Sequence, residues 1–281
     1  MSEENEKSLV LSVEEQSEYA SYIENRFSGL EELCENDEDF LKPWYMIELY
    51  AQMAGAAKAI NEKVCPKRPI AFRSPETISL KIEDSFAGKI PVIRVEDVAD
   101  FEDLVTNTAY RGERPDNIDK TGASFIHGKT VRYMILSYKP YSNVPAGVLG
   151  LDEVAWKEKS MQLRFGHECT HFFTKQTFGI SNNILHDEVM ADFIGMYEAF
   201  GFYKAEWFLR FMGLVGNDGG RIIFYTKDLS ENVRKAVAYL IREAAFGLER
   251  WSKTEAFAAM TVGERIRRMC REGLTGMAKI C

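Results

Sequence analysis

The sequence predicts an α+β fold, with a small and mainly antiparallel sheet beside two long helices. Runs of β-branched residues with strand-like alternation are confined to residues 77–137. Helical spacing of apolar residues dominates before and after them. With 281 residues, of which 46 % are hydrophobic, the chain is long enough for one large domain or two small ones. We divide it into an N-terminal helical segment (1–66) packed on the core, a sheet lobe with two motif helices (67–200) and a C-terminal helical lobe (201–281).

The N-terminal segment is expected to form two helices. Ser12 and Glu15 make a capping box ahead of an amphipathic helix that reaches about Leu33. After an acidic connection at 35–39, a second helix begins near Pro43, a residue that the first turn of a helix tolerates. This helix ends before Pro66.

The sheet is expected to contain three strands, at residues 77–82, 90–95 and 130–137. Residues 107–129 are interrupted by glycine, proline, aspartate and asparagine and have no sustained periodicity. They are interpreted as a long surface loop, a type of segment that is either functional or mobile.

Two helices with glycine at their C-terminal ends follow the third strand. The first runs from about Asp152 to Phe178 and is closed by Gly179; the second runs from about Asn183 to Phe200 and is closed by Gly201. The remainder is expected to be helical, with a turn at 217–220. Two further capping boxes are predicted, formed by Ser252 with Glu255 and by Thr261 with Glu264.

Charge and composition exclude several partners and locations. A net charge of -8 disfavours nucleic acid and anionic membrane surfaces, so neither is expected as a partner. The N-terminus has no signal-peptide pattern, and no apolar run approaches the length of a membrane span. The five cysteines are odd in number and form no CxxC pair, which favours reduced thiols and a cytoplasmic location.

Residues 166–171, Gly-His-Glu-Cys-Thr-His, contain an HExxH motif within the first of these two helices. Four residues advance a helix by about 400°, so His167 and His171 point the same way and can bind one cation. Glu168 lies about 100° round the helix, where it can reach a water molecule on the metal as a general base. Cys169 is turned about 200° from His167 and is expected to be a small buried core residue.

A catalytic zinc site needs a third protein ligand, and the following helix supplies candidates within 186–192, His-Asp-Glu-Val-Met-Ala-Asp. HExxH followed by this ExxAD-like stretch resembles the gluzincin metallopeptidases. The resemblance implies that Glu188 is the glutamate ligand and that Asp192 orients a ligating histidine through a hydrogen bond. His186 stays an alternative third ligand, whereas Asp187 is expected to complement the helix dipole in the first turn.

The resemblance covers about residues 130–200 and implies a zincin-like fold, Zn²⁺ as cofactor and a peptide or protein as substrate. It also implies that the strand at 130–137 is the edge strand along which a peptide lies. The expected function is therefore that of a zinc metallopeptidase, with residues 67–281 as one catalytic unit and Glu168 as the base that activates a water molecule on the metal. Two alternatives are a catalytically inactive regulatory or interaction protein that keeps the metal site, and a metal-free helical interaction protein.

No motif identifies a residue that stabilises the oxyanion of peptide hydrolysis. Five residues near the two motif helices carry suitable groups but are expected to be structural or exposed: Tyr138, Tyr141, Tyr203, Tyr225 and Arg221.

Overall fold

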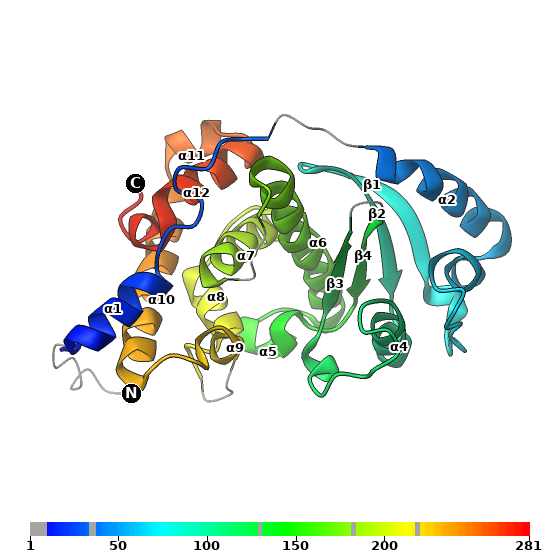
Figure 1. Ribbon diagram of the computed structural model, residues 1–281, viewed down its shortest axis with the longest axis horizontal. Coiled ribbons are helices and arrows are strands. Elements are labelled where there is room, and N and C mark those ends of the chain that lie inside the picture. The colour runs from blue at the N-terminus through cyan, green and yellow to red at the C-terminus, as the bar shows by residue number, and fades with distance from the viewer. Residues whose placement is uncertain (1–9, 34–37, 129–130, 181–183, 217–219) are drawn as a thin grey trace. The chain divides into compact units, whose positions relative to one another are not determined.

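In a computed structural model of the protein, the structure is described for all residues except 1–9, 34–37, 129–130, 181–183 and 217–219 (Figure 1). The chain forms two compact units. One unit, the sheet unit, consists of residues 32–180 and 194–201; the other, the helical unit, consists of residues 1–31, 181–193 and 202–281. The predicted α+β class is confirmed, because one four-stranded sheet is combined with many helices.

The sheet is mixed and has the strand order β1-β2-β4-β3. Its strands are β1 (Ser79–Ser85), β2 (Gly88–Val95), β3 (Ala123–His127) and β4 (Arg132–Ser137). β1 with β2, and β3 with β4, pair antiparallel, whereas β2 and β4 pair parallel through Val92–Val95. Pro91 lies just before the segment that pairs with β4, so the missing N–H of proline removes no hydrogen bond from that pairing.

Two expectations about the sheet are wrong. The segment 107–129 is not one long loop, because it contains the end of α4 (Val98–Thr108), a 3-10 turn at Ile118–Lys120 and strand β3. The third predicted strand, β4, is not an edge strand, since β2 and β3 flank it on both sides. The connection through α4 leads to β3, and the hairpin from β3 to β4 then places β4 parallel to β2, so that β3 lies on the outer side of β4.

The inner strands are buried on both faces. On one face, β2 and β4 pack against α2 (Lys42–Ala54) and α4 in a core of large apolar residues that includes Trp44, Ile93, Phe101 and Ile135. The alternate residues Val92, Met134 and Leu136 are also fully buried, and α6 (Glu153–Phe178) contacts β3 and β4 (Figure 1). The predicted second helix is broken at Gly55, whose φ of 93° ends α2 before a short α3 (Ala56–Ala59) and a π-helical turn at Ile60–Val64.

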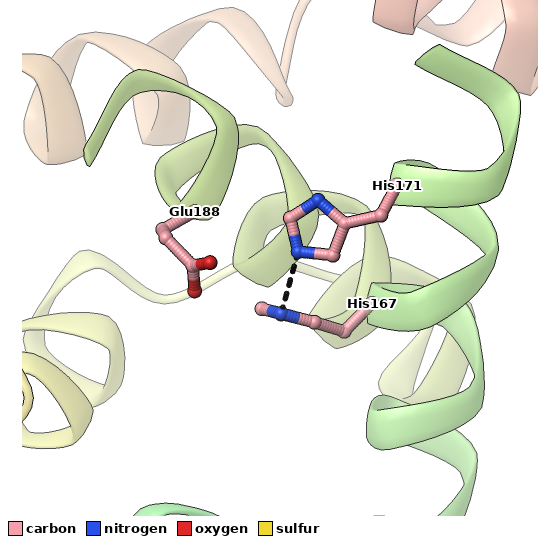
Figure 2. Close-up of side chains that lie close together, drawn as sticks. All are labelled: His167, His171 and Glu188. Atoms are coloured by element: carbon pink, nitrogen blue, oxygen red, sulfur yellow. Dashed lines mark hydrogen bonds between the residues drawn. The ribbon is translucent and has the colours of Figure 1, made fainter. Parts of the chain in front are cut away.

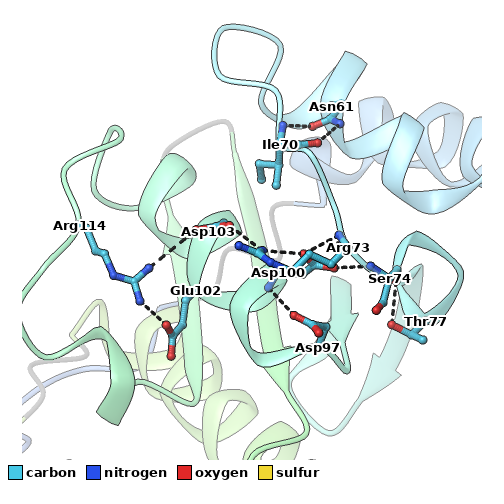
Figure 3. Close-up of polar contacts among 10 residues, drawn as sticks. All are labelled: Asn61, Ile70, Arg73, Ser74, Thr77, Asp97, Asp100, Glu102, Asp103 and Arg114. Atoms are coloured by element: carbon cyan, nitrogen blue, oxygen red, sulfur yellow. Dashed lines mark hydrogen bonds and ion pairs between the residues drawn. The ribbon is translucent and has the colours of Figure 1, made fainter.

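A polar network ties the segment before β1 to α4 (Figure 3). The buried carboxylate of Asp100 accepts hydrogen bonds from the main-chain N–H groups of Arg73 and Ser74 and from the Arg73 guanidinium. Asn61 binds both main-chain groups of Ile70. The segment before β1 is irregular, and these side chains supply hydrogen-bond partners for its main-chain groups. Buried main-chain groups need such partners.

The helical unit consists of α1, the first half of α7 and the helices that follow it. These helices are α1 (Val13–Tyr22), α7 (Leu185–Phe200), α8 (Ala205–Met212), α9 (Ile222–Thr226), α10 (Glu231–Trp251), α11 (Glu255–Ala259) and α12 (Val262–Met277). Phe193, Trp251 and Phe257 contact one another at its centre, with ring centroids 4.8 to 5.8 Å apart. Among the helices that the structure describes, none combines the length and apolarity that crossing a membrane requires.

Most of the predicted helix ends are confirmed, and two are corrected. Capping boxes form at Ser12 and at Thr261 as predicted. The first helix ends at Tyr22 rather than near Leu33, and the cap of α11 is Thr254 rather than Ser252, which ends α10. The expected start of the second motif helix at Asn183 and most of the expected turn at 217–220 lie outside the described residues.

Candidate metal centre

The HExxH motif lies in the second half of α6, which is capped at both ends and has its C-cap at Gly179 as expected. Asp152 accepts hydrogen bonds from the N–H groups of Val154 and Ala155, at 2.9 and 3.1 Å. Gly179 closes the helix in the left-handed conformation, with φ 74°. The structure therefore confirms the predicted helix.

The two motif histidines face each other. Their Nε2 atoms are 3.0 Å apart and their ring centroids 4.7 Å apart, and both residues are buried, with exposed fractions of 6 % and 4 %. Two Nε2 ligands of one tetrahedral zinc ion would be separated by about 3.3 Å, given zinc–nitrogen distances near 2.05 Å. The arrangement is therefore close to that needed to bind one ion.

Glu188 on α7 joins the two histidines (Figure 2). Within the part of the chain that the structure describes, His167, His171 and Glu188 form a group whose potential ligand atoms all lie within 4.8 Å of one another. All three residues are buried. Two imidazoles and one carboxylate are the donor set of a common class of catalytic zinc site, so these residues fit a metal ion.

Tyr141 orients His167 from the other side of the ring. Its Oη lies 2.9 Å from Nδ1 of His167, and its exposed fraction is 4 %. The contact is made through Nδ1, the ring nitrogen that does not face His171. Tyr141 was expected to be structural or exposed, because no sequence motif links it to the histidines.

Two acidic residues of α7 contact Arg221, the residue just before α9. Arg221 pairs with the fully buried Asp192, and one of its nitrogens lies 3.8 Å from the Glu188 carboxylate. Burial and the nearby charge of Glu188 raise the pKa of Tyr225, which therefore stays a neutral phenol. The partner that the structure shows for Asp192 is thus Arg221; its expected bond to a ligating histidine stays a prediction.

The alternative ligand His186 has a different environment. Its Nε2 lies 3.2 Å from the carbonyl oxygen of Met269, and its ring packs edge-on against Phe27 at 5.2 Å. Burial lowers its pKa to about 4, so the ring is neutral and its Nε2–H can donate to that carbonyl. His186 does not belong to the group formed by the two motif histidines and Glu188.

The other residues of the two motif stretches differ in burial. Glu168 is half-buried, and its expected approach to a water molecule on the metal stays a prediction. Cys169 is fully buried, and burial raises the pKa of its thiol to about 12, which makes it an inert core residue as expected. Asp187 lies in the first turn of α7, where its negative charge interacts favourably with the positive end of the helix dipole.

Fold and site define an α+β protein with a buried His-His-Glu group that could hold a metal ion. The chain belongs to a family described as "Family of unknown function (DUF7005)", whose model matches residues 46–132 and 130–279. Searches of curated proteins and of solved structures gave no significant match.

Proposed function

We propose that the protein is a zinc metallopeptidase, with His167, His171 and Glu188 as ligands and Glu168 as general base. The observation that carries the proposal is the convergence of three buried ligand side chains from two helices. Burying two imidazoles and a carboxylate is unfavourable unless they are paired or coordinate a metal, and this donor set suits zinc. The resemblance of the motif and of the Glu188–Asp192 stretch to gluzincins supports a zincin-like fold and peptide bonds as the substrate.

A zinc ion held there would polarise the scissile carbonyl and lower the pKa of a water molecule. Glu168 follows His167 directly and is half-buried, so its carboxylate can accept the proton of the attacking water and return it to the leaving amine. His167 and His171 need a free electron pair on Nε2, and for His167 the Tyr141 hydroxyl can accept a hydrogen bond from the proton that Nδ1 then carries. The positive charge of Arg221 offsets the negative charges of Asp192 and Glu188.

Strand β3 offers the main-chain edge on which a peptide substrate can align. Hydrogen bonds from Gly128 N to Val131 O and from Ser137 N to Gly122 O fix the register with β4. By antiparallel alternation, the main-chain groups of Ala123 and Phe125 then point away from β4. Among the described residues nothing hydrogen bonds to these outward groups.

The position of β3 beside the motif helix favours this use of its edge. Phe125 packs edge-on against Phe172, the residue after His171, with ring centroids 5.7 Å apart. A peptide that adds a strand here would gain main-chain hydrogen bonds whatever its side chains. The role first expected for β4 is therefore assigned to β3.

A binding or regulatory protein that retains the ion without hydrolysis is the second candidate. The half-buried Glu168 argues against it, because a purely structural site needs no general base.

The test compares the purified wild type with Glu168→Gln. We expect near-stoichiometric zinc in both proteins, cleavage of a broad peptide library by the wild type, and loss of about 10²-fold or more of that activity in the variant. Zinc in both proteins without cleavage by either would favour the regulatory candidate. Lack of zinc binding by the wild type would refute the metal centre.

A further inference from the structure

The turn that carries Tyr141 has an unusual main chain. Ser142 and Asn143 both adopt left-handed conformations, with φ of 52° and 57°. Two successive non-glycine residues in this region cost on the order of 1 kcal/mol each or more. Within the turn, short-range bonds from Asn143 N to Pro140 O and from Val144 N to Tyr141 O oppose this cost. The turn therefore needs support from outside.

One face of α6 supplies that support. Arg164 donates to the carbonyl oxygens of Ser137 and Lys139 at 2.6 and 2.8 Å, which fixes the chain before the turn. Trp156 Nε1 donates to the carbonyl oxygen of Val144 at 2.7 Å, which fixes the chain after it. Each end of the strained turn is thus hydrogen bonded to a buried side chain of α6.

The middle of the turn is held from the same face. The N–H of Tyr141 donates to Ser160 Oγ at 3.0 Å, and the Arg164 guanidinium lies over the Tyr141 ring, 5.6 Å from its centroid. Helical spacing places five residues on a single stripe of α6, because successive members are three or four residues apart. In order they are Trp156, Ser160, Arg164, His167 and His171.

We propose that Tyr141 is a positioning residue for the metal centre, which sets the ring orientation of His167. The inference rests on the proposed zinc site. A ring that binds zinc through Nε2 carries its proton on Nδ1, and the phenol oxygen 2.9 Å away accepts that proton's hydrogen bond. The same hydroxyl can donate to Nδ1 when the proton is on Nε2, so the ring stays oriented in either tautomer.

A phenol in this place also has a chemical consequence. A neutral oxygen accepts a weaker hydrogen bond than a carboxylate would, so His167 donates less electron density to the ion than a histidine bonded to an acid. The ion therefore stays a stronger Lewis acid, at some loss of affinity. The first three residues of the stripe serve to hold this hydroxyl in place.

The experiment measures zinc affinity by chelator competition for the wild type, Tyr141→Phe and Tyr138→Phe. Tyr138 is the matched control, since it lies three residues away, is half-buried and packs against Lys157 on α6. We expect Tyr141→Phe to bind zinc about 10- to 100-fold more weakly and Tyr138→Phe to bind it as the wild type does. Urea unfolding of the zinc-free proteins shows that the variants fold.

A second readout needs no variant. In the zinc-loaded wild type, ¹⁵N NMR should show the His167 proton on Nδ1, slow to exchange with solvent and close to the Tyr141 ring. Equal zinc affinity of the wild type and Tyr141→Phe, or a rapidly exchanging Nδ1 proton, would overturn the inference while leaving the metal centre intact. A wild type that binds no zinc would overturn both.

Discussion

Gly166 and Gly195 bring the main chains of α6 and α7 into contact. A β-carbon on Gly166 would lie 3.0 Å from the Cα of Gly195, and one on Gly195 would lie 2.5 Å from the carbonyl oxygen of Leu163 and 3.0 Å from the nitrogen of His167. No other residue type fits at these distances. The crossing therefore fixes the second half of α7 directly against the turn that carries the first ligand histidine.

Replacing Gly195 with alanine is expected to push the two helices apart. The added carbon meets rigid backbone rather than a movable side chain, so we expect a loss of about 2 kcal/mol in the free energy of unfolding. Zinc affinity should fall as well, because the ligand helices separate. Urea unfolding and chelator competition measure the two effects.

Gly147→Ala is the control for this variant. A β-carbon there meets nothing within 4 Å, and the residue lies in α5 (Ala146–Leu149), where alanine is favourable. Its stability should be unchanged or slightly increased. If Gly195→Ala behaves like Gly147→Ala, the close crossing has no role in the site.

Replacing Glu188 and replacing His186 are expected to have different effects on zinc affinity. Glu188→Ala removes a ligand from the His167–His171 group, so zinc affinity should fall by a factor of about 10² or more. His186→Ala removes a hydrogen bond to Met269 and an aromatic contact with Phe27, so it should lower stability but not zinc affinity. Loss of zinc only in His186→Ala would reverse the ligand assignment.

Arg221 is expected to stabilise the two carboxylates of α7. Arg221→Met leaves the fully buried Asp192 without this cation, and we expect a loss of about 3 kcal/mol in the free energy of unfolding. The double variant Arg221→Met/Asp192→Asn should recover part of the loss, because the buried charge is then absent. Calorimetry or urea unfolding of the single and double variants measures the coupling; strictly additive losses would contradict it.

The ion pair between Lys139 and Glu102 should make stability depend on pH. Its atoms are 2.8 Å apart and both side chains are nearly buried. Burial acts to raise the pKa of Glu102, but hydrogen bonds from Lys139 and Arg114 outweigh it, and the pKa is lowered from 4.5. Because the folded-state pKa is the lower one, the stabilisation is present above the ordinary pKa and is lost as the pH falls through the lowered value.

Glu102→Gln tests this relationship. At neutral pH it should cost about 3 kcal/mol, because the buried Lys139 loses its charged partner. In acid the wild type and the variant should converge, since Glu102 is then protonated. Urea unfolding at a series of pH values gives the difference; a constant difference across the acid range would exclude the ion pair as its cause.

The candidate metal centre could be predicted from the sequence where its residues lie one helical turn apart. His167 and His171 lie one turn apart in a helix whose caps are readable, so their convergence follows from geometry alone. Predicting that Glu188 lies beside these histidines required a resemblance to known motifs, because its position depends on how α6 and α7 cross. Gly166 and Gly195 bring those helices close, and nothing in the sequence pairs these two glycines.

Other features depend on contacts between distant segments, which a local pattern does not encode. β3 has only five residues in a stretch rich in turn formers, and its partner β4 supplies the hydrogen bonds that make it a strand. Tyr141 lies in a turn whose conformation is imposed by α6. One signal was available: Trp156, Ser160 and Arg164 continue the stripe of the histidines toward the N-terminus, and a buried arginine requires acceptors nearby.

The stripe of α6 also determines how this chain can tolerate changes in length. One residue inserted between Arg164 and His167 would turn both histidines by about 100° relative to the part of the helix that holds the Tyr141 turn. His167 would then lose its contact with the Tyr141 hydroxyl, even though every residue of the HExxH motif was still present. A functional relative of this protein should therefore preserve the number of residues from Trp156 to His171, whereas the surface turns can change in length.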